Sequence, residues 1–132
     1  MTGPTRITAP DGVAPAAQYS HVVIGTGRFV AVSGQLALDE DGRLVGEGDP
    51  EAQARQVFEN LSRCLAAAGA TFEDVVKLTY FVTDMAYLPA IRAARAARIP
   101  DDRLPAASAV QVAALVSPAF LMEIEAFAVV AR

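Results

Sequence analysis

The sequence has one cysteine, Cys64, one histidine, His21, and no tryptophan. An internal disulfide needs two cysteines, and one thiol with one imidazole falls short of the ligand set of a usual zinc site. We therefore expect no metal centre. Cys64 recurs with apolar neighbours at helical spacing, which favours a buried structural thiol over a nucleophile.

Basic residues are also few. The sequence has 11 lysines and arginines and 15 acidic residues, which gives a net charge of −4. Contacts from lysine and arginine to phosphate supply much of the affinity of nucleic-acid-binding proteins, and no polybasic run is present to hold a membrane surface. Apolar runs stop short of the roughly 20 residues of a membrane-spanning helix, and the first residues lack the apolar stretch of a secretory signal. We expect a cytoplasmic protein without nucleic-acid or membrane partners.

What the sequence does have is apolar residues, which make up 53% of its 132 positions, while charged residues make up 20%. This balance is typical of a compact folded chain, and no repeat or linker divides it, so we expect a single domain over residues 1–132. The mean hydropathy of +0.32 is high for a lone small domain. An interface between subunits could absorb that excess.

The first half of the chain predicts two strands and a helix. Two valine-rich segments, 21–25 and 28–34, are joined by a Thr-Gly pair, which predicts a β-hairpin. A helix is predicted to follow from Asp49, a good N-cap, with Pro50 at its first position. Gly69 should end this helix, because glycine readily takes the left-handed conformation found after helix C-termini.

The second half of the chain predicts a further strand, a second helix and two last strands. Residues 75–84 are rich in β-branched and aromatic side chains and predict a strand. A second helix is predicted from about 84–88 to Arg98, with Pro89 tolerated in its first turn. Residues 104–130 predict two last strands, separated by a Ser-Pro break. The order β-β-α-β-α-β-β predicts an α+β fold with both helices on one face of the sheet.

The last strand carries two carboxylates in an otherwise apolar run. Glu123 and Glu125 are two residues apart, so their side chains point to the same face of an extended strand. Two interpretations stay open. Both are solvated carboxylates on the polar face of a half-buried strand, or one of them is a general acid or base that orients a water molecule. Spacing alone does not decide between them.

Other candidate residues also have ordinary structural explanations. Ser33 and Gly34 end a predicted strand at a point where the backbone can approach a ligand closely. His21 precedes an apolar run and is by default a structural or surface residue. Tyr80 lies in a predicted strand, where core packing or a hydroxyl on the strand face is favoured over a catalytic acid, and it is also a candidate substrate-binding residue.

Three arginines recur along the second predicted helix. Arg92, Arg95 and Arg98 fall three apart, which places their guanidinium groups along one side of the helix. A solvated face is the default for such a row, although a guanidinium is also the natural binder of a substrate carboxylate. The sequence contains no dinucleotide fingerprint, P-loop, nucleophile elbow or zinc-binding helix motif.

Four segments taken together resemble the RidA/YjgF family, formerly called L-PSP endoribonucleases. They are PAAQYSH (15–21), VAVSGQL (30–36), the stretch 51–85 and MEIEAFAV (122–129), which occur in the family's order and cover most of the chain. The resemblance implies a chorismate-mutase-like α+β fold and a homotrimer with a small-molecule cleft at each subunit interface. It also implies hydrolysis of reactive enamines and imines, such as 2-aminoacrylate, to 2-keto acids and ammonia without a metal or organic cofactor.

The resemblance also assigns residues to roles. In the family's well-studied branch, a glutamate is thought to hold the attacking water, and Glu123 matches it as the first glutamate of the family's EIEA ending. Ser33 and Gly34 match the serine and glycine of the family's SGQ motif at the ligand. His21 stands where that branch has an aromatic residue near the ligand.

One departure affects substrate binding. The family's carboxylate-binding arginine, in its motif of proline, any residue, arginine and serine, corresponds to Ala107, and a cysteine two residues later corresponds to Ala109. The strand expected to face Glu123 has thus lost its cation, at a cost on the order of 2–5 kcal/mol for a buried pair. Aligned without gaps from FVTD, Arg92 falls where the branch has an asparagine-type residue near the cleft. Our hypothesis is that Arg92 supplies a relocated positive charge.

Two functions follow from this comparison. The first is a Rid-type enzyme that adds water to an imine, an enamine or a related small nitrogen compound and differs in substrate from the ordinary 2-aminoacrylate deaminase. The second is a trimeric small-molecule-binding or regulatory protein that kept the cleft and lost the chemistry. Ribonuclease activity, as in the family's old name, fits poorly with the negative net charge and the absence of a histidine pair or a histidine-lysine pair.

Overall fold

A computed structural model describes residues 3–132. Within this range lie the helices α1 (Pro50–Ala67) and α2 (Leu88–Ala96) and the strands β1 (Thr5–Ile7), β2 (Val22–Ile24), β3 (Arg28–Gln35), β4 (Val75–Val82), β5 (Ala106–Gln111) and β6 (Met122–Val130). Short 3-10 turns occupy Phe72–Asp74, Met85–Tyr87 and Asp101–Arg103. No helix in the described range has the length and apolarity needed to cross a bilayer.

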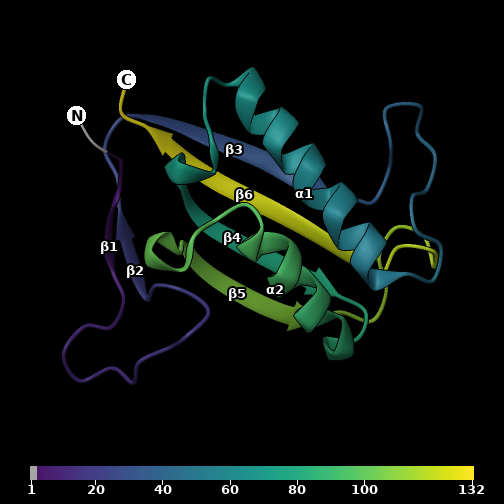
Figure 1. The fold of residues 1–132 in the computed structure, drawn as a ribbon, viewed down its shortest axis with the longest axis horizontal. Coiled ribbons are helices and arrows are strands. Elements are labelled where there is room, and N and C mark those ends of the chain that lie inside the picture. Colours follow the sequence, from purple (N-terminus) through teal and green to yellow (C-terminus); the bar gives the residue numbers. More distant parts are fainter. Residues whose placement is uncertain (1–2) are drawn as a thin grey trace.

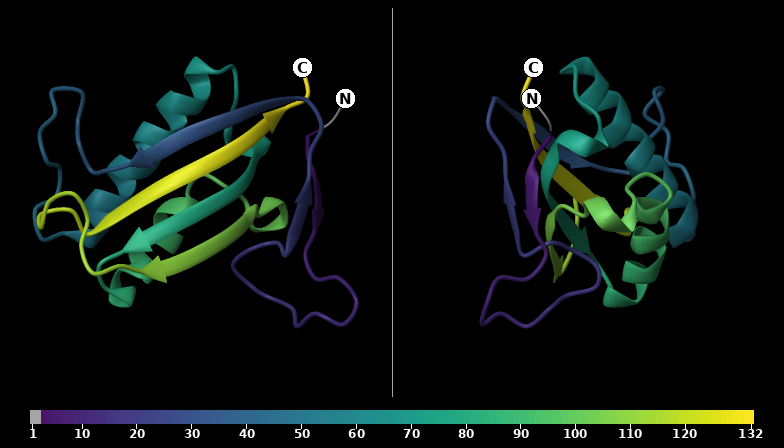
Figure 2. Two further views of the ribbon diagram at one scale, coloured as in Figure 1. Left: turned by 180° about the vertical axis from the view of Figure 1, so that it is seen from behind. Right: turned by 60° about the vertical axis from the view of Figure 1, so that its left-hand side comes forward.

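The main sheet has the strand order β3-β6-β4-β5, in which β4 and β5 run parallel and the other pairs antiparallel. Both α-helices lie on one face of this sheet (Figure 1). Seen from behind, the opposite face carries no helix of the part of the chain that the structure describes (Figure 2). We call this uncovered side the open face. The predicted α+β architecture with two helices on one face is therefore confirmed.

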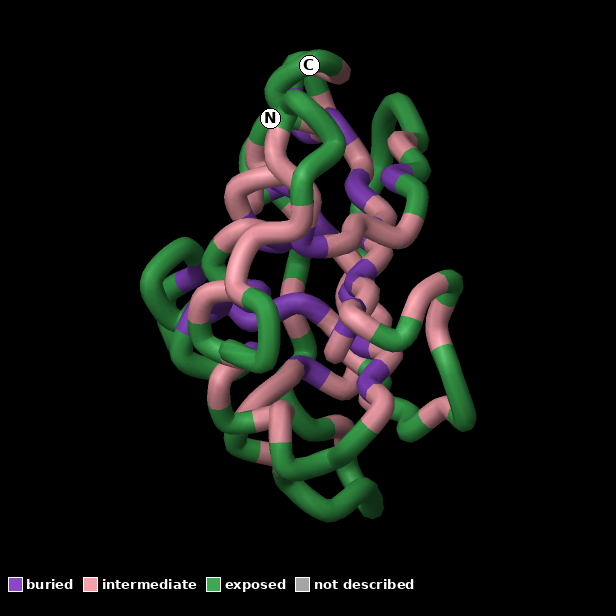
Figure 3. Tube along the Cα trace, turned by 90° about the vertical axis from the view of Figure 1, so that its right-hand side faces the viewer, coloured by how far each residue is buried: buried purple, intermediate pink, exposed green. Residues whose placement is uncertain are grey.

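The core lies between the helices and the sheet. Alternate residues of β6 are buried there, and they meet an apolar stripe of α1. The buried residues of these two elements include Met122, Ile124, Ala126, Ala128 and Val130 from β6, and Val57, Phe58, Leu61 and Leu65 from α1. Burial of each large apolar side chain stabilises the fold by about 1.5–3 kcal/mol. Buried segments accordingly run through the middle of the molecule and exposed ones along its loops (Figure 3).

The ends of α1 agree with the sequence prediction. The side chain of Asp49 accepts a hydrogen bond from the backbone N–H of Ala52 at 3.1 Å. Gly69 takes a φ of 72°, and the chain reverses so that the N–H of Ala70 donates to the carbonyl of Leu65 at 2.9 Å. These local bonds satisfy backbone groups that a helix end leaves without partners.

The predicted hairpin between the two N-terminal strands is wrong. β2 pairs with β1 in a separate two-stranded sheet, and β3 pairs instead with β6. Two glycines in the connection explain the difference. A side chain at Gly27 would collide with the backbone of Val130, and one at Gly25 would press on Val129. The chain therefore passes close over the end of β6, and β2 leaves the main sheet rather than folding back along β3.

A buried glutamine sets the position of β6 relative to α1. The Gln53 side chain is fully buried, and its Nε2 donates to the carbonyls of Gly46 at 3.0 Å and Ala119 at 2.9 Å. Its Oε1 accepts from the N–H of Leu121 at 3.0 Å. Since the buried amide is fully used, it costs little to bury and holds the segment that leads into β6. This segment precedes Glu123 directly.

The start of β4 is held by Asp74, which is only 2% exposed. Its carboxylate accepts from the N–H of Thr71 at 2.9 Å and from two guanidinium nitrogens of Arg132 at 3.1 and 3.0 Å. Burial alone would raise the pKa of Asp74, but the bonds from Arg132 and Thr71 outweigh it and hold the pKa below its ordinary value.

Because the folded-state pKa of Asp74 is depressed, its ionised form contributes stability above its unfolded pKa of about 4 and loses it as the pH falls through the folded pKa. We expect Asp74→Asn to lower the free energy of unfolding at pH 7 by about 1–3 kcal/mol. The difference from wild type should shrink on the acid side of about pH 4. Urea unfolding of wild type and variant, at pH 7 and again below about pH 4, measures the difference in stability. Asp101→Asn, a change at an exposed position, is the control. A difference that does not change with pH would contradict the assignment.

Candidate functional site

The candidate site residues fall into two groups at opposite edges of the main sheet. Ser33 and Gly34 lie on the edge strand β3, beside Glu123 on β6. We call these three residues the glutamate group. The second group surrounds Ala107 on the other edge strand, β5. The strands β6 and β4 lie between the two edges.

The glutamate group is built on an irregularity of β3. The register between β3 and β6 shifts between Val32 and Gln35, so Ser33 and Gly34 occupy a bulge. A side chain at Gly34 would collide with the carboxylate of Glu123. Glycine is therefore the residue that lets the carboxylate lie against the backbone of the bulge. The sequence predicted that a ligand can approach the backbone closely at Ser33 and Gly34. Within the chain, the group that approaches Gly34 closely is the carboxylate of Glu123.

Glu123 and Glu125 share the open face, as their spacing predicted. Their neighbours in β6 are buried toward the helices, whereas the two glutamates are half-buried on the opposite side. Phe81 lies opposite Glu123 in the ladder, and Thr79 lies opposite Glu125. Among residues 3–132, neither an ion pair nor a hydrogen bond engages the Glu123 carboxylate. Its oxygens can therefore accept a hydrogen bond from a water molecule or a ligand.

A small cavity of about 70 Å³ lies at the β5 edge, and we call it the β5-edge pocket. Its walls come from four parts of the chain. They are Gln18 and Tyr19 before β2, Tyr80 of β4, Leu88 and Arg92 of α2, and Ala107, Ser108 and Ala109 of β5. The parallel register sets Tyr80 beside Ala109, so both point toward the helices. Four predicted residues, Tyr80, Arg92, Ala107 and Ala109, thus meet in one cavity.

Tyr80, which lines this pocket, has a buried hydroxyl. It is 5% exposed, and its hydroxyl has no hydrogen-bond partner within the described range. Burial raises the pKa of Tyr80 to about 12, although the positive charges of Arg95 and Arg92 act in the opposite direction. The phenol is therefore neutral at physiological pH and has a proton to donate.

The expectation of a solvated arginine row is wrong for Arg95. Its side chain is 3% exposed, and its Nη2 donates to Oε1 of Gln18 at 3.0 Å. Its Nε and Nη1 have no partner among the described residues. Arg98 does follow the expectation, since it forms a partly exposed ion pair with Glu59 at 2.8 Å. The signal for Arg95 was its helical spacing from the buried Ile91, which places both on the core side.

The expectation that the strand of Ala107 faces Glu123 is also wrong within one chain. β4 separates β5 from β6, and Ala107 points toward the helices, whereas Glu123 points to the open face. His21 does not line the β5-edge pocket. Its Nε2 lies 2.7 Å from the carbonyl oxygen of Ala14, and its ring contacts that of Tyr19 edge-on. Tyr19, which sequence reasoning missed, is the aromatic residue before β2 that lines the pocket, together with Tyr80 of β4.

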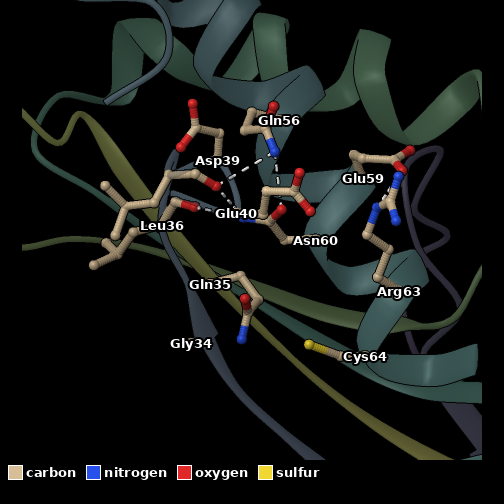
Figure 4. A pocket seen from close by; sticks show the side chains of 11 residues that line it. Gly34, Gln35, Leu36, Asp39, Glu40, Gln56, Glu59, Asn60, Arg63 and Cys64 are labelled. Atoms are coloured by element: carbon tan, nitrogen blue, oxygen red, sulfur yellow. Dashed lines mark hydrogen bonds and ion pairs between the residues drawn. The ribbon is translucent and has the colours of Figure 1, made fainter. Parts of the chain in front are cut away.

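A larger depression of about 590 Å³ lies between α1 and the segment after β3 (Figure 4). Its amides are already engaged, because Nδ2 of Asn60 donates to the carbonyls of Leu36 and Leu38 at 3.0 and 2.9 Å. Cys64, expected to be buried, is half-buried at its wall. The carboxylates of this depression are those of Asp39, Glu40 and Glu59, against the single guanidinium of Arg63. It is thus poorly suited to an anionic ligand.

Comparisons with known proteins agree with this architecture. A family model described as Endoribonuclease L-PSP matches residues 9–130. The chain is 38% identical over 125 residues to the 3-aminoacrylate deaminase RutC of Acinetobacter baylyi, covering 95% of this chain and 98% of the relative. It is also 38% identical over 117 residues to a RutC family protein of Synechocystis, covering 88% of each.

Solved structures give the same result. A Rid family protein of unknown function from Yersinia pestis, YyfB, superposes with a TM-score of 0.84 at 38% identity, covering 95% of this chain and 98% of that one. A putative endoribonuclease from Thermotoga maritima superposes with a TM-score of 0.73 at 35% identity over 100% and 99% of the two chains. The similarity extends through both edges of the sheet where the candidate residues lie. The chain therefore belongs to the L-PSP endoribonuclease family, together with the Rid and RutC proteins.

Proposed function

We propose that this protein is a Rid-type hydrolase that converts a small imine or enamine to a carbonyl compound and ammonia. An enamine is first protonated on carbon, which converts it to the imine. Water then adds to the carbon of the C=N bond, and the C–N bond breaks as ammonia leaves. The carboxylate of Glu123 carries this proposal. It lies on the open face against the backbone of Gly34, without a partner among residues 3–132, and there it can accept a proton from the attacking water.

The complete site needs more than one copy of the chain. Neighbouring strands are about 4.8 Å apart, so the β3 and β5 edges are separated by roughly 14 Å, and the two groups also point to opposite faces. A ring of identical copies, with the β5 edge of one against the β3 edge of the next, would join the β5-edge pocket to a glutamate group. The open face exposes Phe29, at 66%, which such an interface would cover. The number of three copies follows from the family resemblance.

Similarity to RutC supports the reaction class, because the name of that relative specifies deamination of an enamine, 3-aminoacrylate. The test generates 3-aminoacrylate, or imines released by an amino-acid oxidase, in the presence of the protein. Ammonia and carbonyl products are then followed over time. We expect release at least about tenfold above the uncatalysed rate, which is modest for an enzyme. Equal rates with and without the protein across the panel would exclude the proposal.

Ala107 stands where the family resemblance implies a carboxylate-binding arginine, and this favours a second candidate, a non-catalytic protein that binds or senses small molecules. It would use the same pocket and the same assembly. Saturable ligand binding without turnover of any substrate in the panel would identify it. Glu123→Gln would then leave ligand affinity unchanged.

A further inference from the structure

We propose that the β5-edge pocket is a carboxylate site in which Arg92 and the Tyr80 hydroxyl bind the anion, while the buried guanidinium of Arg95 holds the pocket residue Gln18. The binding cation thus comes from helix α2 instead of strand β5. The inference rests on the proposed function only in that this pocket receives the substrate. It narrows the substrate class to small imines or enamines that carry a carboxylate.

The first observation is a positive charge without a counter-charge. Arg95 is buried, whereas Arg92, one turn earlier on the same helix, is exposed and lines the pocket. Within residues 3–132, no carboxylate lies at ion-pair distance from either guanidinium, whereas Arg98 on the same helix pairs with Glu59. A buried cation without a counter-charge is strongly unfavourable, and an anionic ligand in the adjoining pocket supplies the opposite charge.

The second observation is an excess of hydrogen-bond donors. The hydroxyl of Tyr80 and the Nε and Nη1 groups of Arg95 are buried and have no partner in the described range. The oxygen of the Gln18 side chain already accepts from Arg95, which leaves the amide N–H groups of Gln18 to donate. The phenol of Tyr80, the amide of Gln18 and the guanidinium of Arg92 line the cavity, and Arg95 is hydrogen-bonded to Gln18 without lining the cavity itself. Carboxylate oxygens accept from all three.

The third observation concerns the space that the cavity offers. At about 70 Å³ it is far smaller than the roughly 300–1,000 Å³ of pockets for drug-sized ligands, so it suits one small polar group. The short side chains of Ala107 and Ala109 leave this space open, and an arginine at position 107 would occupy it. In this proposal the small alanine at position 107 leaves room for the ligand, and Arg92 on α2 supplies the positive charge that an arginine at position 107 would supply.

The roles of the two arginines differ. Arg92 lines the cavity and is placed to contact the anion directly. Arg95 lies behind the wall formed by Gln18, so it acts as a positioning residue. It orients the Gln18 side chain and supplies a fixed positive charge. A lysine at position 95 keeps the charge, whereas a glutamine removes it.

Calorimetric titration with pyruvate and its neutral analogue pyruvamide tests the carboxylate site without any turnover. We expect the assembled wild-type protein to bind pyruvate at least about tenfold more tightly than pyruvamide. Arg92→Gln and Tyr80→Phe should each weaken pyruvate binding by about tenfold or more, since each removes a bond to a charged oxygen. Arg95→Gln should weaken it as well, and Arg95→Lys should restore part of the affinity. Arg98→Gln, the matched control on the same helix, should bind as wild type.

The outcome separates this inference from the proposed function. Pyruvate binding that depends on Arg92 and Tyr80, in a protein that turns over no imine, would keep the carboxylate site and exclude the hydrolase. Equal affinity for pyruvate and pyruvamide, or no pyruvate binding at all, would overturn the inference even if the protein is an active hydrolase. Wild-type affinity in both Arg92→Gln and Tyr80→Phe, each folded by circular dichroism, would also overturn it.

Discussion

Glu123→Gln is expected to lower turnover of an imine or enamine substrate by at least about a hundredfold, because a positioned general base contributes 10²–10⁴-fold to such reactions. The amide has nearly the same size as the carboxylate and keeps its contact with the backbone at Gly34. It cannot take a proton from water. Glu123 is half-buried on the open face and makes no ion pair within the described range, so the change should leave stability within about 0.5 kcal/mol.

Glu125→Gln is the matched control for this measurement. Glu125 lies on the same strand and face, opposite Thr79, but the three atoms nearest a side chain placed at Gly34 all belong to Glu123. We expect its turnover to stay within about twofold of wild type, as for a surface change outside the site. Equal losses in both variants would mean that the carboxylates act through the combined negative charge of the open face. An active Glu123→Gln variant would mean that another group holds the water.

The parts of the fold that depend on neighbours in sequence were predictable. The caps of α1 at Asp49 and Gly69 use bonds that span only a few residues, and both were located from residue type alone. The common face of Glu123 and Glu125 follows from the two-residue period of any strand. The bulge at Gly34 was indicated only as a place of close approach, because the approaching group comes from a distant strand.

What could not be predicted depends on contacts between distant segments. The order of strands in the sheet decides that β4 lies between Ala107 and Glu123, and no local pattern encodes that order. The burial of Arg95 depends on Gln18, which is 77 residues away in the sequence. Its spacing from Ile91 was available as a signal, but the charge of arginine argued for solvent. Charged side chains are rarely fully buried unless they are paired, so this exception is informative.

Mixing two inactive variants is expected to restore about a quarter of wild-type activity, since each site, as we propose it, draws its two halves from different copies. Glu123→Gln keeps the β5-edge pocket intact and lacks the general base. Ala107→Leu keeps Glu123 and fills the pocket of about 70 Å³ with additional carbons. When equal amounts assemble at random, half of the pockets and half of the glutamates are intact. About one site in four therefore combines an intact pocket with an intact glutamate, whatever the number of copies in the ring.

The measurement compares each variant alone, the two variants refolded together, and Glu123→Gln refolded with the double variant Glu123→Gln, Ala107→Leu. The last mixture has no intact Glu123 and should stay inactive, while native mass spectrometry verifies that mixed assemblies form. Activity confined to the first mixture would locate the reaction between copies. Mixed assemblies without activity would mean that the pocket and Glu123 do not act on the same substrate molecule. Because the two groups lie on opposite edges and faces of one sheet, contact between copies is the route by which this fold can bring them together.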